Sequence, residues 1–508
     1  MRHTHIALCA LAAAVLSACG GGSTGPTIDA SPARGTLFAN PPNLVPIPQA
    51  DGSAVPTLEP AAFAAMLEAA EPGITQVTGA PRCTVSTYYM KYATVGGAGE
   101  ATDATGAIMV PSGAAAGCSG AHPVVLYAHG TATGKSNNMA NLRDNTEAAL
   151  AAAMYAAQGF IVVAPNYAGY DVSSLSYHPY LNAEQQANDM IDALRAARKA
   201  FGTIGATDSG KLLLTGYSQG GHVAMATQRA MQTSYASEFT VTALAGLSGP
   251  YALGLLGDAS FAGSPALGGT VFLPLLTTSF QKSYGGIYGS ASDIYEDKYA
   301  AGIDALFPTA TLTFSQIFSS GKLPQTALFS SSSLPGPSAP QFGAFFGADN
   351  LVKTSYRNSY LADMQAHPCG VNPADPLNCA PANALRKAGL KNDLRTYVPT
   401  VPVLLCGGHS DPTVFFASTQ ATAGFFQAKG MPAQALAVLD VDSTPTGASD
   451  PFAPAKVGFG MAKAAAISAA VSAHVDPTVA VASQYHGTLV PPFCSAAARG
   501  FFQQVLAH

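Results

Sequence analysis

The chain has 508 residues, more than one ordinary domain needs, and 48% of them are hydrophobic, so a large core with an insertion is expected. Only 10% of the residues are charged, far below the usual share of about a quarter. The formal net charge is −5 and no basic run occurs, which argues against a nucleic-acid partner. No apolar stretch after the N-terminal segment is long enough for a transmembrane helix, and no internal repeat is visible.

The N-terminus has the pattern of an export signal. Arg2 supplies a positive charge, and residues 6–15 are apolar but too few to span a bilayer. The next residues, Leu-Ser-Ala-Cys19, have the form of a bacterial lipobox. We therefore predict a lipoprotein signal peptide over residues 1–18 and a lipid on Cys19. The alternative is an ordinary secreted protein in which Cys19 has no such role.

Gly20 follows the lipobox and is not an inner-membrane retention signal in Gram-negative lipoproteins. The expected location is therefore the outer membrane of a Gram-negative bacterium, with the lipid as the contact to the membrane. Residues 19–50 are rich in Gly, Ser, Thr and Pro, which predicts a flexible tether. The sequence leaves open which face of the membrane the protein occupies.

Six cysteines remain besides Cys9 in the signal and Cys19. An even number in an exported protein favours disulfides. A metal site is less favoured, because no C-x-x-C pair occurs with a matching pair of histidines. Chain order and local spacing favour the pairs Cys83–Cys118, Cys369–Cys379 and Cys406–Cys494, although six cysteines allow about 15 pairings.

Apolar β-type runs alternate with helical patterns in the first half of the chain. We expect strands at residues 87–95, 106–110, 123–127, 160–164, 211–215 and 241–245, with helices at 141–158, 182–201 and 219–234. Such alternation predicts an α/β fold, with a mostly parallel central sheet and helices on both faces. We assign residues 51–250 to the first part of this core.

The alternation stops after Pro250 and returns near residue 400. Residues 251–395 are rich in aromatic side chains and in loop-like runs, so we expect an inserted cap or lid region. Some of these aromatics could line an acyl pocket, although most are expected to form the core of the cap itself. Residues 396–508 complete the α/β core, with strands at 401–406 and 435–441 and helices at 414–429 and 494–506.

Gly216-Tyr-Ser218-Gln-Gly220 lies between an apolar strand pattern and a helix pattern. A G-x-S-x-G sequence in this setting is typical of a nucleophile elbow, a strained turn that exposes the serine. Gly216 and Gly220 would leave room where a Cβ clashes. Ser218 is therefore the candidate nucleophile, and the alternative is a Gly-rich turn with a buried serine.

A serine nucleophile needs a base and an acid that orients the base. Asp411 follows the expected strand 401–406 in a Gly-rich turn, which would place its carboxylate at the carboxyl edge of the sheet. Asp440 and Asp442 are weaker candidates. His486 lies in what we expect to be a Gly-flanked loop before the last helix, and His474 is its rival.

The tetrahedral oxyanion of the reaction also needs donors. The amide of Gln219, directly after the serine, is one candidate. The second is expected from the loop after strand 123–127, which reads Ala-His129-Gly130-Thr131, and we assign it to Thr131 or a neighbour. His129 is expected to shape this loop. No metal or organic cofactor is required by this chemistry.

Several short segments together resemble a known family. They occur in this order: Tyr127-Ala-His-Gly-Thr131, Ala164-Pro-Asn-Tyr-Ala-Gly169, His178-Pro-Tyr-Leu181, Leu194-Arg-Ala-Ala-Arg198 and Gly216-Tyr-Ser-Gln-Gly-Gly-His222. The chain is similar to the secretory lipase family of α/β-hydrolases, of the Candida antarctica lipase A type, and to its bacterial relatives. The resemblance implies an α/β-hydrolase fold with a cap, activity on carboxylic esters, and the roles given above to Ser218, Asp411 and His486.

The leading hypothesis is a lipid-anchored serine esterase or lipase that acts on apolar acyl esters through an acyl-enzyme. A polyester or hydroxyalkanoate oligomer hydrolase and a serine aminopeptidase use the same elbow and stay open as alternatives. A third hypothesis is a non-catalytic lipoprotein that binds apolar ligands. Acyl-chain length, alcohol partner, cap motion and oligomeric state are not determined by the sequence.

Overall fold

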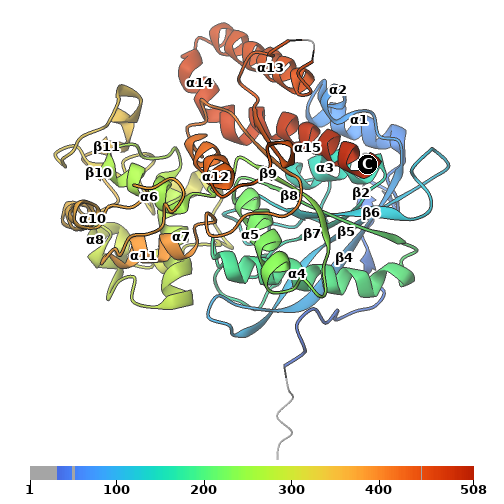
Figure 1. The fold of residues 1–508 in the computed structure, drawn as a ribbon, viewed down its shortest axis with the longest axis horizontal. Coiled ribbons are helices and arrows are strands. Elements are labelled where there is room, and N and C mark those ends of the chain that lie inside the picture. Colours follow the sequence, from blue (N-terminus) through green and yellow to red (C-terminus); the bar gives the residue numbers. More distant parts are fainter. Residues whose placement is uncertain (1–30, 49–51, 448) are drawn as a thin grey trace, which may run out of the picture. The chain divides into compact units, whose positions relative to one another are not determined.

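The computed structural model describes residues 31–48, 52–447 and 449–508. Its centre is a nine-stranded sheet in the order β1-β4-β5-β7-β6-β8-β9-β12-β13 (Figure 1). The strands are β1 Asn43–Leu44, β4 Thr84–Val95, β5 Ala101–Ser112, β6 His122–Ala128, β7 Ile161–Pro165, β8 Asp208–Tyr217, β9 Val241–Leu247, β12 Val403–Gly407 and β13 Leu436–Asp440.

The six strands from β7 to β13 in this order are parallel, and β4 and β5 run antiparallel at the other side. Parallel strands with both faces covered are apolar throughout, as β7 and β12 are, since every residue in both is buried. The predicted mostly parallel α/β sheet is confirmed.

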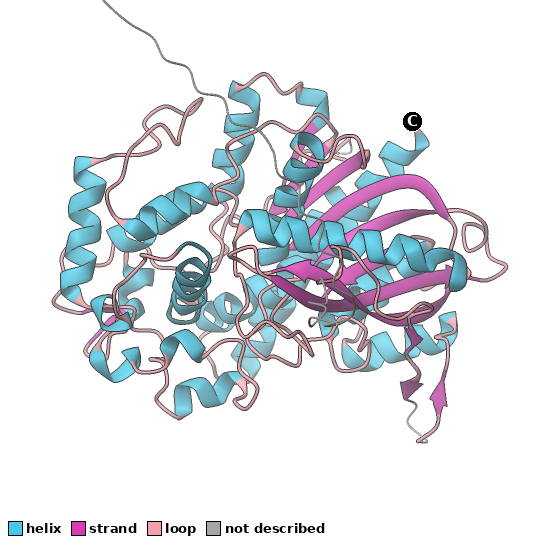
Figure 2. Ribbon diagram, turned by 90° about the horizontal axis from the view of Figure 1, so that it is seen from below, coloured by secondary structure: helices cyan, strands magenta, loops and turns pink. Residues whose placement is uncertain are grey.

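Helices cover both faces of the sheet (Figure 2). One face packs against α4 Ala183–Ala200, α5 Gln219–Thr233 and α12 Ala417–Ala428. The other face packs against α1 Pro60–Ala70, α3 Thr146–Met154 and α15 Val490–Ala507. The short α2, Ile74–Thr78, contacts α15. Asn182 caps α4, because its side chain accepts a hydrogen bond from the Gln185 amide at 3.1 Å.

The predicted tether is partly corrected by the structure. Within residues 33–48, Gly35 and Phe38 donate backbone hydrogen bonds to β4, and β1 pairs with the same strand. Arg34 forms an ion pair with the buried Asp192 at 2.8 Å. The physical reason is that β4 would otherwise present an open sheet edge, which this segment covers. A hairpin of β2 Ile47–Pro48 and β3 Ala54–Val55 follows. The predicted signal 1–18 and lipid site Cys19 lie outside the described residues.

Residues 251–395 contain short helices joined by long loops and have a hydrophobic core of their own. The helices are α6 Leu253–Ala262, α7 Gly269–Tyr284, α8 Asp297–Ala300, α9 Phe314–Ser319, α10 Thr354–Ala366 and α11 Ala384–Lys391, with a two-stranded pair of β10 Phe329–Ser330 and β11 Phe346–Gly347. Figure 1 shows these helices together on one side of the large sheet. Most of the aromatics in this region are packed in this core or against it, whereas Phe314 is 57% exposed.

The C-terminal part contains two helices that the sequence analysis did not predict, α13 Ala453–Ser472 and α14 Pro477–Gln484. A π-helical turn, Tyr485–Leu489, joins α14 directly to α15. The last helix therefore begins at Val490 and is part of a longer helical run.

The structure contains the three predicted disulfides: Cys83–Cys118, Cys369–Cys379 and Cys406–Cys494. The third links β12 to α15, and its two cysteines are 88 residues apart along the chain. No helix in the described ranges is long and apolar enough to cross a membrane.

Candidate active site

Ser218 occupies the sharp turn between β8 and α5, with φ 57° and ψ −121°. A positive φ at a non-glycine residue costs about 1–3 kcal/mol and persists only where the surroundings fix it. The neighbouring glycines are required by space, since a Cβ on Gly220 would overlap the carbonyl of Ala128, and one on Gly216 would overlap Gly220. This is the geometry expected for the nucleophile elbow.

The structure brings Ser218, His486 and Asp411 into one hydrogen-bonded chain. His486 Nε2 lies 2.8 Å from Ser218 Oγ, and His486 Nδ1 lies 2.6 Å from Asp411 Oδ2. With Nδ1–H donating to the carboxylate, Nε2 is left free to accept the serine proton. The three residues come from separate elements and are 268 and 75 positions apart along the chain.

Asp411 is nearly buried and lies in the turn after β12. Its Oδ1 accepts hydrogen bonds from the amides of Thr413 at 2.9 Å and Val414 at 3.0 Å, so Oδ2 is the oxygen that faces His486. These two contacts fix the orientation of the carboxylate toward the imidazole.

His486 lies in the π-helical turn, so the expected loop before the last helix is wrong in its detail. The backbone carbonyl of His486 accepts a hydrogen bond from the hydroxyl of Tyr217 at 2.5 Å. Burial raises the pKa of Tyr217 well above its usual value, so this hydroxyl stays a donor. The residue before the nucleophile thus holds the backbone of the histidine.

The rival acids and base lie in other contacts. Asp440 accepts from His409 Nδ1 at 2.8 Å, and Asp442 contacts Lys463 and the hydroxyl of Tyr485. His474 is exposed at the connection between α13 and α14, with φ 57°. None of the three contacts Ser218 within the part of the chain that the structure describes.

The amides of Gln219 and Thr131, the two predicted oxyanion donors, donate to no other group within the described ranges. The amide of Gly130, directly before Thr131, already has a hydrogen-bond acceptor. It donates to both carboxylate oxygens of Glu147, at 2.9 and 3.1 Å. The loop after β6 therefore offers the Thr131 amide and not that of Gly130.

Three polar residues near these donors were not assigned a role from the sequence. Glu147, on α3, also accepts from Tyr127 Oη at 2.9 Å, and burial raises its pKa to about 7. His178 lies 2.7 Å from the side-chain nitrogen of Gln219, and Tyr180 Oη lies 3.1 Å from Thr131 Oγ1. The only sequence signal for the latter two was their place in the segment His178-Pro-Tyr-Leu181.

His129, which was expected to shape its loop, is buried between aromatic rings and stacks on Tyr167 with the ring centroids 4.1 Å apart. Its Nδ1 lies 2.7 Å from Gly130 O and its Nε2 3.1 Å from Asn166 O. Burial lowers its pKa to about 4, so the ring is neutral near pH 7. These contacts fit a structural part in the loop.

A pocket of about 160 Å³ begins at Ser218 and Gln219 and extends among the helices of residues 251–395. Its wall is mainly apolar, with Leu253, Leu276 and Phe272 among its residues. Gly254 and Gly257 of α6 also line it, beside Leu390 and Tyr360, two other residues of the wall.

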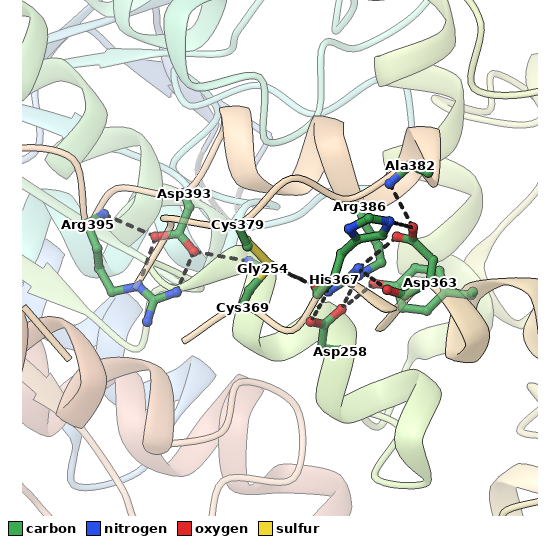
Figure 3. The surroundings of a disulfide bond; sticks show 11 residues. Gly254, Asp258, Asp363, His367, Cys369, Cys379, Ala382, Arg386, Asp393 and Arg395 are labelled. Carbon is green, nitrogen blue, oxygen red and sulfur yellow. Dashed lines mark hydrogen bonds and ion pairs between the residues drawn. A yellow bond between two sulfur atoms is a disulfide. The ribbon is translucent and has the colours of Figure 1, made fainter. Parts of the chain in front are cut away.

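The pocket wall also contains a cluster of polar side chains that pair with one another (Figure 3). Arg386 contacts Asp258 at 2.9 Å and Asp363 at 2.7 Å, and its Nη2 lies 3.4 Å from Cys369 Sγ beside the Cys369–Cys379 disulfide. Because these charges are paired with one another, the wall presents little unpaired charge to a ligand. Among the described residues no cluster of three or more His, Cys, Asp or Glu could hold a metal ion.

Comparison with known proteins gives a consistent result. The family model of the secretory lipases matches residues 139–263, which include the serine turn. The ligand-bound rice cell wall degrading esterase LipA from Xanthomonas oryzae is 26% identical, with 94% of this chain and 99% of that chain covered and a TM-score of 0.68. No curated protein matches the chain.

Two further solved structures are more distant. A putative hydrolase from Legionella pneumophila is 18% identical over 91% of this chain and 97% of that chain, with a TM-score of 0.63, which supports the fold alone. Candida antarctica lipase A is 13% identical over 80% of this chain and 77% of that chain, with a TM-score of 0.48.

The sheet topology and these matches define a carboxylic ester hydrolase with the α/β-hydrolase fold. Within that class, the chain is similar to the secretory lipase family, which confirms the family resemblance predicted from its motifs.

Proposed function

We propose that this protein hydrolyses esters of apolar carboxylic acids through a covalent acyl-enzyme. The observation that carries the proposal is the hydrogen-bonded chain from Ser218 through His486 to Asp411. Ser218 Oγ attacks the ester carbonyl as His486 Nε2 takes its proton. Asp411 keeps the imidazole in the required tautomer and stabilises its charged form. His486 then protonates the leaving alcohol, and water releases the acyl group by the same route.

The negative charge on the tetrahedral intermediate is stabilised, in this proposal, by the backbone amides of Gln219 and Thr131. Two observations support these donors. The Gln219 amide directly follows Ser218 and the Thr131 amide lies in the loop after β6, and neither donates to another group in the described part of the chain. Preorganised donors of this kind contribute about 100- to 1000-fold each to the rate.

The acyl group of the substrate fits the apolar pocket that opens at Ser218. Residues 251–395 supply most of its wall and have a separate core, which supports their proposed role as a cap over the site. Among the described residues that line this wall, Asp258 is the one carboxylate, and it is paired with Arg386 and not free to hold a substrate amine. An ester with an apolar acyl group is therefore favoured over an aminopeptidase substrate.

The test is hydrolysis of p-nitrophenyl esters from acetate to palmitate by the full mature chain, with Ser218→Ala in parallel. The variant is expected to lose about 10⁶-fold in kcat while it folds normally. A fluorophosphonate probe should label the wild type at Ser218 and leave the variant unlabelled. Unchanged turnover in Ser218→Ala would refute the proposed nucleophile.

Turnover of none of these esters would direct attention to the alternatives. Because a relative is described as degrading rice cell walls, esters of plant cell-wall material belong in the same panel, together with hydroxyalkanoate oligomers. Absence of both turnover and probe labelling would support the non-catalytic binding protein instead.

We also propose that the chain is exported and carries a lipid on Cys19, which holds the protein on a membrane. The support is the lipobox in the sequence and the match to a family of secretory enzymes. Cys19→Ser should move the protein from the membrane fraction to the soluble fraction of the host. Mass spectrometry of the mature N-terminus gives an independent answer, since an unmodified Cys19 would contradict the proposal.

A further inference from the structure

The segment from His178 to Leu181 contacts both residues that carry the candidate oxyanion amides. We propose that His178 and Tyr180 are positioning residues that fix Gln219 and Thr131 in the geometry needed to stabilise the transition state. This inference rests on the proposed function, and it assigns a role to a sequence motif that the Ser–His–Asp chain does not use.

His178 holds the side chain of Gln219. The imidazole Nδ1–H donates to the carbonyl of Ala168 at 3.0 Å, so Nε2 carries the lone pair and accepts from Gln219 Nε2 at 2.7 Å. Burial lowers the pKa of His178 to about 3, which keeps this arrangement neutral over the working pH range. Gln219 is 1% exposed and is the first residue of α5, so a fixed side chain also fixes its amide.

Tyr180 holds Thr131 from the opposite loop. Tyr180 Oη and Thr131 Oγ1 are 3.1 Å apart, and each hydroxyl can donate or accept. Tyr180 is 5% exposed and lines the pocket beside Ser218 and Gln219. The contact joins residues 49 positions apart and restrains the peptide that carries the Thr131 amide.

The backbone that presents these side chains is itself strained and tightly held. Leu181 has φ 52°, and Tyr167 has φ 65° in the loop that supplies the Ala168 carbonyl. The amide of Ala168 donates to the buried Asp189 at 2.6 Å. Strained conformations of this kind cost free energy and cluster where geometry is part of the function. Here they place the rings of His178 and Tyr180 against the two oxyanion residues.

A positioning role makes a definite kinetic prediction. The donors act on charge that exists only in the transition state, so their misplacement lowers kcat and leaves KM nearly unchanged. Loss of a whole donor costs about 100- to 1000-fold in kcat. Loss of one positioning contact leaves the donor present, so we expect a smaller decrease, about tenfold.

The experiment compares Tyr180→Phe, Thr131→Val and the double variant, each of which removes only the paired hydroxyls. Each single variant should lose about tenfold in kcat with KM within about twofold, and the double variant should lose no more than the worse single variant. Affinity for a boronic acid that mimics the tetrahedral intermediate should fall in parallel with kcat. Thr131→Ser, which keeps the hydroxyl, should retain most of the wild-type activity that Thr131→Val loses.

Tyr177→Phe is the matched control, because it removes a tyrosine hydroxyl from the residue directly before this segment. That hydroxyl contacts Glu100 and the Gly97 amide, away from the oxyanion residues. We expect normal kcat and normal boronate affinity for this variant. Equal losses in Tyr177→Phe and Tyr180→Phe would show a general effect on folding and overturn the inference.

For the other contact, Gln219→Met keeps the backbone amide and removes the group that bonds His178. It should lower kcat and boronate affinity with KM retained. Wild-type kcat in both Tyr180→Phe and Gln219→Met, with turnover still dependent on Ser218, would overturn this inference and leave the proposed function intact. Turnover that does not depend on Ser218 would overturn both.

Discussion

Gly257→Leu tests whether the apolar pocket receives the acyl chain. Gly257 lies on α6 in the pocket wall, and a Cβ there would be 3.1 Å from the hydroxyl of Tyr360, another residue of the wall. The pocket volume is about 160 Å³. A cavity of about 150 Å³ is known to hold benzene, so about six carbons fit. A leucine side chain adds four carbons, which leaves room for about two.

The magnitude follows from the transfer free energy of the acyl carbons. Each buried methylene contributes about 0.8 kcal/mol, or about a fourfold gain in kcat/KM. From acetate to hexanoate the gain is four methylenes, about 3.2 kcal/mol, or up to about 200-fold. The wild type should therefore show this rise and then level off. Gly257→Leu should lose most of it on hexanoate and change little on acetate.

The assay measures kcat/KM for p-nitrophenyl esters from two to ten carbons in both proteins. Gly460→Leu is the matched control, since Gly460 lies on the exposed face of α13 and a Cβ there meets nothing within 4 Å. Melting temperatures and fluorophosphonate labelling check that the fold and the serine are unaffected. A chain-length profile in Gly257→Leu that is parallel to that of the wild type would show that the acyl group lies elsewhere.

Three further outcomes are expected. Asp411→Asn should lower kcat by about 10⁴-fold while Asp440→Asn stays near wild type, and the reverse order in the same ester assay would move the acid to β13. Because the pKa of Glu147 is raised to about 7, its folded form is protonated between about pH 4.5 and 7, where the unfolded form is ionised, so its contribution to stability falls as pH rises through this window. Urea unfolding of wild type and Glu147→Gln should therefore show the variant gaining relative stability from pH 5 to pH 8, and a constant difference would contradict the assignment. Replacing Cys406 and Cys494 together by alanine opens an 88-residue loop and should lower the free energy of unfolding by about 4.6 kcal/mol, whereas a loss below about 1 kcal/mol would show that the loop contributes little to the entropy of the unfolded chain.

The parts of the fold that could be predicted are those whose signal is local. β6 and β8 each contain a short apolar run with a glycine two residues beyond it, Gly130 and Gly216. The turn at Ser218 requires small neighbours for steric reasons, and this requirement is visible in five residues of sequence. The expected places of the acid after strand 401–406 and of the base before the last helix then selected Asp411 and His486. The structure joins both to Ser218 in one hydrogen-bonded chain.

The parts that were missed depend on contacts between distant residues or lack a periodic pattern. α13 exposes apolar side chains such as Met461 at 69% and Val471 at 58%, so its sequence has no alternation between an apolar and a polar face. Gly35, Phe38 and β1 within residues 33–48 bond to β4, a partner far along the chain that the local sequence does not indicate. The contact of Tyr180 with Thr131 has no local signal at all.

The arrangement separates the reacting groups from the groups that set specificity. Ser218, Asp411 and His486 all follow elements of the large sheet or precede its last helix, and the Cys406–Cys494 disulfide joins the strand before the acid to the helix after the base. The pocket wall, in contrast, comes mainly from residues 251–395, which pack in their own core. A change such as Gly257→Leu can therefore alter the acyl preference without moving the serine and the histidine. Activity on the acetate ester distinguishes an effect on the reacting groups from an effect on the pocket wall, because hydrolysis of acetate needs the reacting groups and almost none of the pocket.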